Sequence, residues 1–313
     1  MFKILGREIA KGESVTIEVE VAKLHTRNSL RIPVIVERGL EDGPVLLLMG
    51  GVHGDETNGV AILRDIIRQK YNRPKRGTVI CIPVFNVIGF LNQSREFPDG
   101  RDLNRMFPGS ERGALASQFA HKFTTEIAPL VDYVIDYHTG GASRENFSNV
   151  RCVFTDEKQL ALAKLFGGPF IVNSKTIPKS IRETINKMGK TILLFEGGKS
   201  LHLDRDVIQC GVDGALNIMT HLGMREGEIS KKHESVLVQS SKWLRAPFSG
   251  MFQSSVSNGT WVKKKTIIGR IYDPYGEFEK NVLAPSDCYI FGLNTAPIVY
   301  KGDAIFHVSL ETL

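Results

Sequence analysis

From about residue 30 to about residue 230, short apolar runs alternate with longer amphipathic segments, and this alternation limits the possible folds most strongly. The runs RIPVIVE and VLLLMGG are followed by a segment starting at Glu56 that puts Leu63, Ile66 and Ile67 on one helical face. TVICIPV comes next. Strand signals that alternate with helix signals predict an α/β domain, with a mixed, largely parallel sheet covered by helices.

The same order continues along the chain. Helical patterns near 113–127 and 157–166 precede or follow the strand-like runs DYVIDYH and FIVN. KTILLFEGG then leads into a long helical stretch that begins near Asp206. These segments extend the predicted α/β domain to residue 232.

After residue 232 the helical periodicity stops. Short β-rich runs such as APFSGMF, SNGTWV and TIIGRIYDPYGE are separated by turn signals. We therefore expect a catalytic domain over 1–232 and a small, β-rich domain over 233–313. Trp243 and Trp261 are expected to pack between strands of this second domain.

Composition narrows the class of protein. The 313 residues are 42% hydrophobic and 24% charged, as in an ordinary globular protein, and the net charge of +6 is spread without a dense basic run, which argues against nucleic acid as a partner. The start shows no secretory signal pattern, no run approaches a membrane span, and the four cysteines lie far apart. We expect a cytoplasmic protein with reduced thiols and no membrane partner. The sequence leaves the oligomeric state open, a homo-oligomer included.

Three buried-looking strands run into glycine turns that carry unusual polar residues. His53 and Glu56 follow VLLLM in the stretch GGVHGDETNG, His138 ends DYVIDYH, and Glu196 lies in ILLFEGG. Ligands of open α/β sheets bind outside the carboxyl ends of the strands, and glycine there lets the backbone approach a ligand closely. We therefore expect these four side chains to meet at one site.

Two histidines and one carboxylate form a common catalytic zinc set with a fourth position left for water. His53, Glu56 and His138 are accordingly the predicted metal ligands, with one zinc ion per chain as the leading assignment. Cobalt, nickel or iron would suit the same nitrogen and oxygen ligands. Glu196 could accept a proton from water and return it to a leaving amine.

Each signal has an alternative interpretation. A histidine after a strand often only makes a structural hydrogen bond, and Glu196 could simply cap the segment that follows it. Asp55 and Asp136, beside the histidines, are candidates to orient the imidazole rings. Because Asp136 alternates with apolar neighbours in its strand, a solvent-facing role is also open.

The irregular loop SREFPDGRDLNRMFPG clusters Arg95, Arg101, Asn104 and Arg105. Charge in such a loop is often only solvated. Arginine nevertheless offers a planar fork for a carboxylate, and Asn104 beside Arg105 could add a donor, so these residues are predicted to bind substrate. A separate arginine could stabilise the oxyanion of a tetrahedral intermediate.

GGVHGDE, GRDLNRMFPG, DYHTGG and LLFEGG, in this order between about residues 40 and 200, resemble the succinylglutamate desuccinylase and aspartoacylase family. That family is related to zinc carboxypeptidases of the carboxypeptidase A type. The resemblance implies zinc on His53, Glu56 and His138, catalysis by Glu196, and a substrate carboxylate on Asn104 and Arg105. It also implies an oxyanion arginine before the Asn-Arg pair, which is Arg95 or Arg101. We favour Arg95 for the oxyanion and keep Arg101 among the substrate-binding residues.

The tail from about residue 235 resembles the β-barrel-like C-terminal domain of the same family and biotinyl or lipoyl carrier folds. It has no lysine in a carrier-type hairpin motif, so a packing or lid role is expected. The resemblance implies a deacylase for a small N-acyl amino acid. Two alternatives remain open, namely a metallocarboxypeptidase that acts on peptides and a binding protein that keeps the fold without hydrolysis. The presence of all three ligands together with Glu196 argues against the second alternative.

Overall fold

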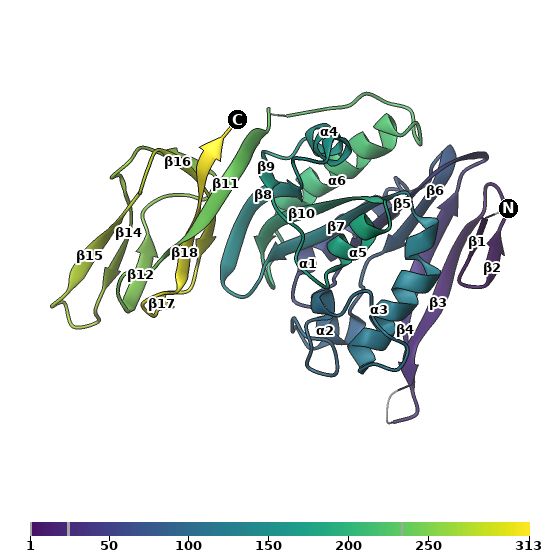
Figure 1. Ribbon diagram of the computed structural model, residues 1–313, viewed down its shortest axis with the longest axis horizontal. Helices are drawn as coiled ribbons and strands as arrows, with labels where there is room; N and C mark the ends of the chain where they lie inside the picture. Colours follow the sequence, from purple (N-terminus) through teal and green to yellow (C-terminus); the bar gives the residue numbers. More distant parts are fainter. Residues whose placement is uncertain (1, 24–25, 233) are drawn as a thin grey trace.

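A computed structural model of the chain describes residues 2–23, 26–232 and 234–313 (Figure 1). Over these residues a twelve-stranded sheet runs through most of the molecule. In spatial order its strands are β13 (Thr260–Val262), β16 (Cys288–Asn294), β18 (Ala304–Thr312), β11 (Val236–Arg245), β9 (Phe170–Asn173), β8 (Arg144–Cys152), β10 (Thr191–Lys199), β7 (Tyr133–Gly140), β5 (Glu41–Gly50), β6 (Arg76–Ile82), β4 (Ser29–Arg38) and β3 (Ser14–Lys23). A hairpin of β1 (Phe2–Ile4) and β2 (Arg7–Ile9) precedes it.

Helices cover both faces of the central strands. They are α1 (Thr57–Arg68), α2 (Val87–Leu91), α3 (Leu115–Glu126), α4 (Glu157–Phe166), α5 (Ile181–Lys187) and α6 (Arg205–His221), with short 3₁₀ turns at Leu103–Arg105 and Ala128–Leu130. The apolar cores place α1, α4 and α6 on one face and α3 and α5 on the other. This arrangement confirms the predicted mixed α/β class.

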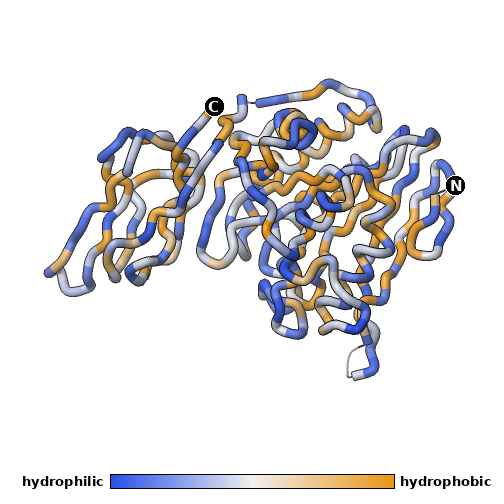
Figure 2. Tube along the Cα trace, in the orientation of Figure 1, coloured by the Kyte–Doolittle hydropathy of each residue, from blue (hydrophilic) through white to orange (hydrophobic). Residues whose placement is uncertain are grey.

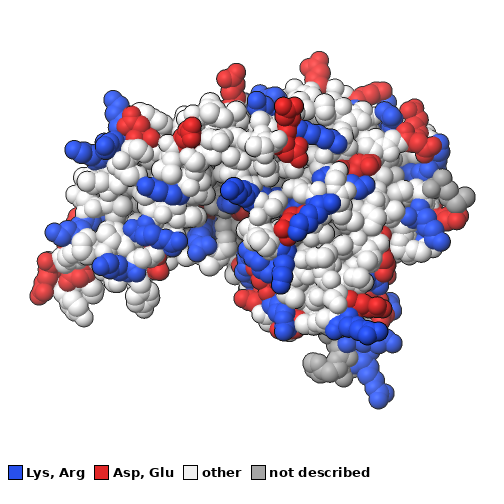
Figure 3. Space-filling model, viewed as in Figure 1, with Lys and Arg blue, Asp and Glu red and all other residues white. Residues whose placement is uncertain are grey.

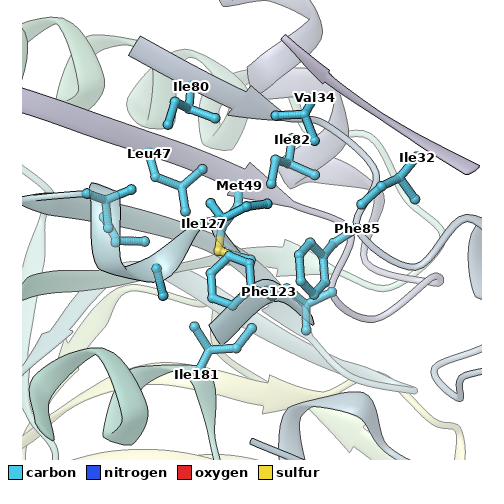
Figure 4. Close-up of a cluster of buried hydrophobic side chains, with 14 of the residues drawn as sticks. Ile32, Val34, Leu47, Met49, Ile80, Ile82, Phe85, Phe123, Ile127 and Ile181 are labelled. Carbon is cyan, nitrogen blue, oxygen red and sulfur yellow. The ribbon is translucent and has the colours of Figure 1, made fainter. Parts of the chain in front are cut away.

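Strand β5 shows why the centre of the sheet needs both layers. Leu46 and Leu48 pack into the core under α1, α4 and α6, whereas Leu47 and Met49 pack into the core under α3 and α5, where Figure 4 shows them beside Phe123. A strand buried on both faces reads as a continuous apolar run instead of an alternating one. Figure 2 shows the same effect as hydrophobic strands joined by hydrophilic loops.

Parallel and antiparallel pairs share the sheet. The central pairs β6–β5, β5–β7 and β7–β10 are parallel, as are β8–β9 and β9–β11. Strand β8 pairs antiparallel with β10. Strand β4 pairs antiparallel with β3 on one side and with β6 on the other. Parallel β5, β7 and β10 bring their carboxyl ends to one edge of the sheet, which is where the polar motifs lie.

All described regular elements after residue 235 are strands. Strands β11, β18, β16 and β13 extend the large sheet, because β11 pairs in parallel with β9 and β16 pairs with β8. A second sheet, β15 (Glu279–Leu283), β14 (Ile267–Tyr272), β12 (Gly250–Ser254) and β17 (Ile298–Val299), packs on them around a separate apolar core (Figure 1). We call residues 234–313 the C-terminal β region. The expected boundary residue 233 lies outside the described residues, so the division into two domains stays a proposal.

Other general features follow the composition. The four cysteines form no disulfide. Basic and acidic side chains are both spread over the face seen in Figure 3. Within the described residues, no helix has the length and apolar character needed to cross a membrane.

Candidate active site

The loop between β5 and α1 is held tightly against its neighbours. A Cβ on Gly54 would lie 1.9 Å from the backbone carbon of Gly89 in α2, so no side chain fits there. The backbone N–H of Glu56 donates to the carbonyl of His53 at 3.2 Å, which closes a turn just before α1. As a result His53 and Glu56 are turned inward, with exposed fractions of 3% and 2%.

His138 reaches the same point from the neighbouring strand. Strands β5 and β7 are paired with Gly50 opposite Tyr137, so the ends of both strands lie together. Glu56 joins the two rings, since its Oε1 lies 2.8 Å from His53 Nδ1 and its Oε2 lies 2.9 Å from His138 Nδ1. One ligand atom from each of His53, Glu56 and His138 lies within 4.8 Å of the others.

Each histidine is held from behind by a second carboxylate. His138 Nε2 lies 2.9 Å from Asp136 Oδ2, and His53 Nε2 lies 3.1 Å from Asp102 Oδ1. With the proton on Nε2, each ring donates to its aspartate and keeps the Nδ1 lone pair toward Glu56. Carboxylates in this position orient metal-binding histidines and raise their basicity.

The charges of this buried cluster depend on one another. Burial alone raises the pKa of Glu56, but the two histidines beside it bring the pKa well below its usual range. Burial alone lowers the pKa of His138, yet the charges of Asp136 and Glu56 raise it well above its usual range, and the pKa of His53 is raised in the same way. Because raised pKa values favour protonated histidines, metal binding there would displace protons.

The donor set fits a divalent metal ion. Two imidazole nitrogens and a carboxylate, all buried and with the outer ring nitrogens engaged by aspartates, are the ligands that zinc prefers in open sites. Asp55, the other aspartate expected near a ring, instead accepts a hydrogen bond from Ser200 Oγ.

The two arginines of the loop, Arg95 and Arg101, lie in different surroundings. Arg95 Nη1 lies 3.2 Å from Glu56 Oε1, and Arg95 Nη2 lies 2.8 Å from Asp102 Oδ2. Arg101 pairs with Asp99 at 3.2 Å and stays half-exposed outside the cavity lining. Sequence reasoning placed the two arginines together, but only Arg95 reaches the ligand set.

Asn104 and Arg105 line the same cavity as the ligand set, which has a volume of about 490 Å³. Asn104 is buried, and its Oδ1 accepts a hydrogen bond from the backbone of Ile181 at 2.9 Å. Arg105 donates to the backbone carbonyl of Asn104. Within the described residues Asn104 Nδ2 has no hydrogen-bond partner, so it is available to a ligand.

Glu196 lies beside His138, because β10 and β7 pair these two residues in register. It lines the same cavity. Its Oε2 accepts a hydrogen bond from Asn146 Nδ2 at 2.6 Å, and its Oε1 lies 3.6 Å from Arg151 Nε.

Several lining residues escaped the sequence reasoning. Trp243, expected to pack between strands, lines the cavity and stacks on His307 with ring centroids 4.8 Å apart. The cavity is also rich in arginine, with Arg95, Arg105, Arg144, Arg151 and Arg182 in its lining. Nothing in the sequence marks Arg182 as a cavity residue. It lies in the helix IRETINK, which is so polar that the burial of one arginine cannot be read from it.

Arg182 is 4% exposed, and Nη1 has no hydrogen-bond partner within the described parts of the chain. Nη2 donates to the carbonyl of Ser174 at 2.8 Å. Burial, followed by the charge of Arg151, lowers the pKa of Arg182 to about 10. A buried, unpaired guanidinium edge is costly unless an anion completes it.

Fold and site together define a class: an α/β protein with a buried His-Glu-His set at the strand ends of an arginine-rich cavity. A family model described as the succinylglutamate desuccinylase/aspartoacylase catalytic domain matches residues 42–222. A curated relative, the N-alpha-acetyl-L-2,4-diaminobutyric acid deacetylase of Halomonas elongata, is 30% identical over 261 residues, which cover 78% of this chain and 75% of the relative. The chain belongs to the succinylglutamate desuccinylase/aspartoacylase family.

Solved structures agree with this assignment. A succinylglutamate desuccinylase/aspartoacylase from Rhodobacter sphaeroides superposes with a TM-score of 0.84 at 25% identity and covers 96% of each chain. The product-bound ectoine utilization protein EutE (DoeB) from Ruegeria pomeroyi has a TM-score of 0.84 at 23% identity and covers 96% of this chain and 95% of its own. The similarity to the Ruegeria pomeroyi protein shows that the two chains share a fold.

Proposed function

We propose that this chain is a zinc-dependent hydrolase that cleaves the amide bond of a small N-acyl amino acid. The observation that carries the proposal is that the His-Glu-His set and Glu196 line one cavity. A volume of about 490 Å³ suits a small molecule. The Halomonas elongata relative, a deacetylase, supports amide hydrolysis as the reaction.

His53, Glu56 and His138 would hold the metal. A zinc ion bound there would supply Lewis-acid polarisation of the acyl carbonyl and would lower the pKa of the attacking water. Glu196, beside His138, would take the proton from that water at a carboxylate oxygen and deliver it to the leaving amine nitrogen. The products are a carboxylate and a free amine.

Arg95 is the better candidate for the oxyanion role. Its Nη1 lies 3.2 Å from Glu56 Oε1, which places a fixed positive group beside the ligand set where negative charge develops on the carbonyl oxygen. Arg101, half-exposed and paired with Asp99, receives no role in the proposed reaction.

A carboxylate of the substrate would bind among Asn104, Arg105 and Arg182. Asn104 Nδ2 and the unpaired Nη1 of Arg182 are donors without partners in the described structure, and charge-assisted bonds from arginine to a carboxylate are strong and directional. This proposal adds Arg182 to the carboxylate pair Asn104 and Arg105 that the resemblance implies, and it assigns no contact to Arg101.

The remaining parts of the proposal concern architecture and location. The C-terminal β region would form a separate β-rich domain that closes one wall of the cavity through Trp243. The absence of disulfides among the four cysteines is compatible with a cytoplasmic location, which we also propose.

Amine release from a panel of N-acetyl and N-succinyl amino acids tests the reaction on zinc-loaded protein. Glu196→Gln should lower kcat by about 10²- to 10⁴-fold, since general acid-base catalysis contributes that much. Glu226→Gln is the matched control, because Glu226 is an exposed residue paired with Lys75 on the surface. A Glu196→Gln variant as active as the control would overturn the proposed role.

Peptides belong in the same panel. Release of a C-terminal residue from peptides, without hydrolysis of any N-acyl amino acid, would replace the deacylase with a carboxypeptidase. Zinc binding without hydrolysis of any panel member would favour a binding protein.

A further inference from the structure

Glu196 does not stand alone in the cavity wall. Its Oε2 accepts a hydrogen bond from Asn146 Nδ2 at 2.6 Å, and Asn146 is 6% exposed. One carboxylate oxygen is therefore held by a buried amide, while Oε1 lies 3.6 Å from Arg151 Nε. A short bond from a buried donor also restricts the side-chain rotation of Glu196.

Asn146 itself lies where three strands meet. On one side of β8 it pairs with Gly198 of β10, and on the other side it pairs with Gly292 of β16. The β8 strand therefore joins the strand that carries Glu196 to a strand of the C-terminal β region. The second contact of the junction, Asn258 Nδ2 to the carbonyl of Glu145 at 3.2 Å, comes from the same region.

Gly292 leaves room for the Asn146 side chain. A Cβ on Gly292 would lie 3.2 Å from Asn146 Oδ1 and 3.0 Å from the Cβ of His307. Both distances are shorter than ordinary contacts, so a methyl group there would press on the amide that holds Glu196. The β16 backbone thus forms the back wall of this amide.

We propose that Asn146 is a positioning residue for Glu196, and that Gly292 of the C-terminal β region leaves the space that the Asn146 side chain needs for this role. The inference rests on the proposed function, because it assigns Asn146 a role through the general base. It gives the C-terminal β region a part in the chemistry: β16 supports the amide that aims the carboxylate.

Steady-state kinetics on zinc-loaded, full-length protein, with a panel substrate that wild type hydrolyses, test the inference. Asn146→Ala should lower kcat by about 10- to 100-fold, a part of the contribution of a general base, with KM within about threefold. Ser148→Ala, two residues further along β8, should keep wild-type kcat. If Asn146→Ala does not fold, Asn146→Leu, which has a similar shape and no charge, removes the same donor and should show the same loss of kcat.

A double-mutant cycle tests the contribution of β16. Gly292→Ala should lower kcat in wild type but cause no further loss in the Asn146→Ala background, because both changes act through one amide. Gly269→Ala is the matched control: its added Cβ would be as crowded, 3.0 Å from the carbonyl of Gln253, but lies among residues of the C-terminal β region. It should leave kcat unchanged.

The outcomes separate the two levels of the account. Wild-type kcat in Asn146→Ala, together with an inactive Glu196→Gln, would overturn the positioning role and leave the proposed function intact. Equal losses from Gly292→Ala in both backgrounds would overturn the β16 link. An active Glu196→Gln would overturn the proposed function itself.

Discussion

A buried arginine with one unpaired nitrogen is the residue that says most about the substrate. Arg182 has no acid matched to Nη1 in the described chain, although burial makes an unmet donor costly. An anionic group of a ligand would remove this cost by accepting a hydrogen bond from Nη1. The anion proposed here is the carboxylate of an acylated amino acid.

Replacing Arg182 with methionine should therefore weaken recognition of that carboxylate. We expect kcat/KM for an N-acyl amino acid to fall by about 10- to 100-fold, as for one charge-assisted hydrogen bond, and to change little for the corresponding amide. Arg101→Met is the matched comparison, because Arg101 is half-exposed and paired with Asp99. A larger loss from Arg101→Met would contradict the role of Arg182 and support the substrate-binding role that the sequence predicts for Arg101.

Asp136 should matter to metal affinity without being a ligand. It holds His138 Nε2 at 2.9 Å, so Asp136→Asn removes the charge that supports the ring. Zinc should bind about 10-fold or more weakly, measured by competition with a chromogenic chelator. Asp65→Asn, at a partly buried position of α1 outside the cavity lining, serves as the control. Equal zinc affinity in both variants would show that the contact does not tune the site.

His307 gives a prediction about pH and stability. Burial, aided by Arg151, lowers the pKa of His307 to about 3, whereas in the unfolded chain it titrates near 6.5. Between these values the unfolded state binds a proton that the folded state does not, so the free energy of unfolding falls as pH decreases. From pH 7 to 5 this residue should account for about 2 kcal/mol, which His307→Gln should remove in urea denaturation. If the free energy of unfolding of the variant falls by the same amount between pH 7 and 5, His307 is not the source of the pH dependence.

At the level of elements, the strands that carry the site were the easiest to predict. VLLLM, YVIDYH and ILLFE read as buried strands because helices cover both faces of β5, β7 and β10, and the glycine turns after them mark the ligand edge. The expected helices over 113–127 and 157–166 match α3 and α4.

Other elements gave no readable signal. Strand β8, RENFSNVRC, lacks an apolar alternation because some of its polar side chains bond to neighbours in the sheet, as Asn146 does to Glu196. Asp102 supports His53 across 49 positions of sequence, and that contact depends on how the whole loop lies. Both features arise from tertiary placement, which local patterns do not encode.

The turn before α1 should be sensitive to a single methyl group. Gly54→Ala would put a Cβ 1.9 Å from the Gly89 backbone, so the His53–Glu56 loop must move. We expect a loss of about 3 kcal/mol in the free energy of unfolding, together with loss of metal binding. Gly189→Ala, at a positive φ of 72° with open space around it, should cost only about 1 kcal/mol. Equal losses from the two substitutions would show that the loop can relax.

On the scale of the whole molecule, the large sheet joins the site to the C-terminal β region. Strand β11 pairs with β9 and also carries Trp243 into the cavity wall, and β16 pairs with β8 behind Asn146. The C-terminal β region is therefore built into the site, although its sequence carries no catalytic motif. The sequence pattern suggests two domains, and the large sheet continues from the first of them into the second.

The central claim is that His53, Glu56 and His138 hold a metal ion that serves amide hydrolysis. Elemental mass spectrometry of zinc-replete protein, read beside amine release from the N-acyl panel, tests it most directly. About one zinc per chain is expected in wild type and in His202→Ala, an exposed histidine control, with near-complete loss of metal and hydrolysis in His53→Ala. Zinc-replete wild type that holds no metal, or a His53→Ala variant that keeps a full equivalent and its activity, would contradict the account.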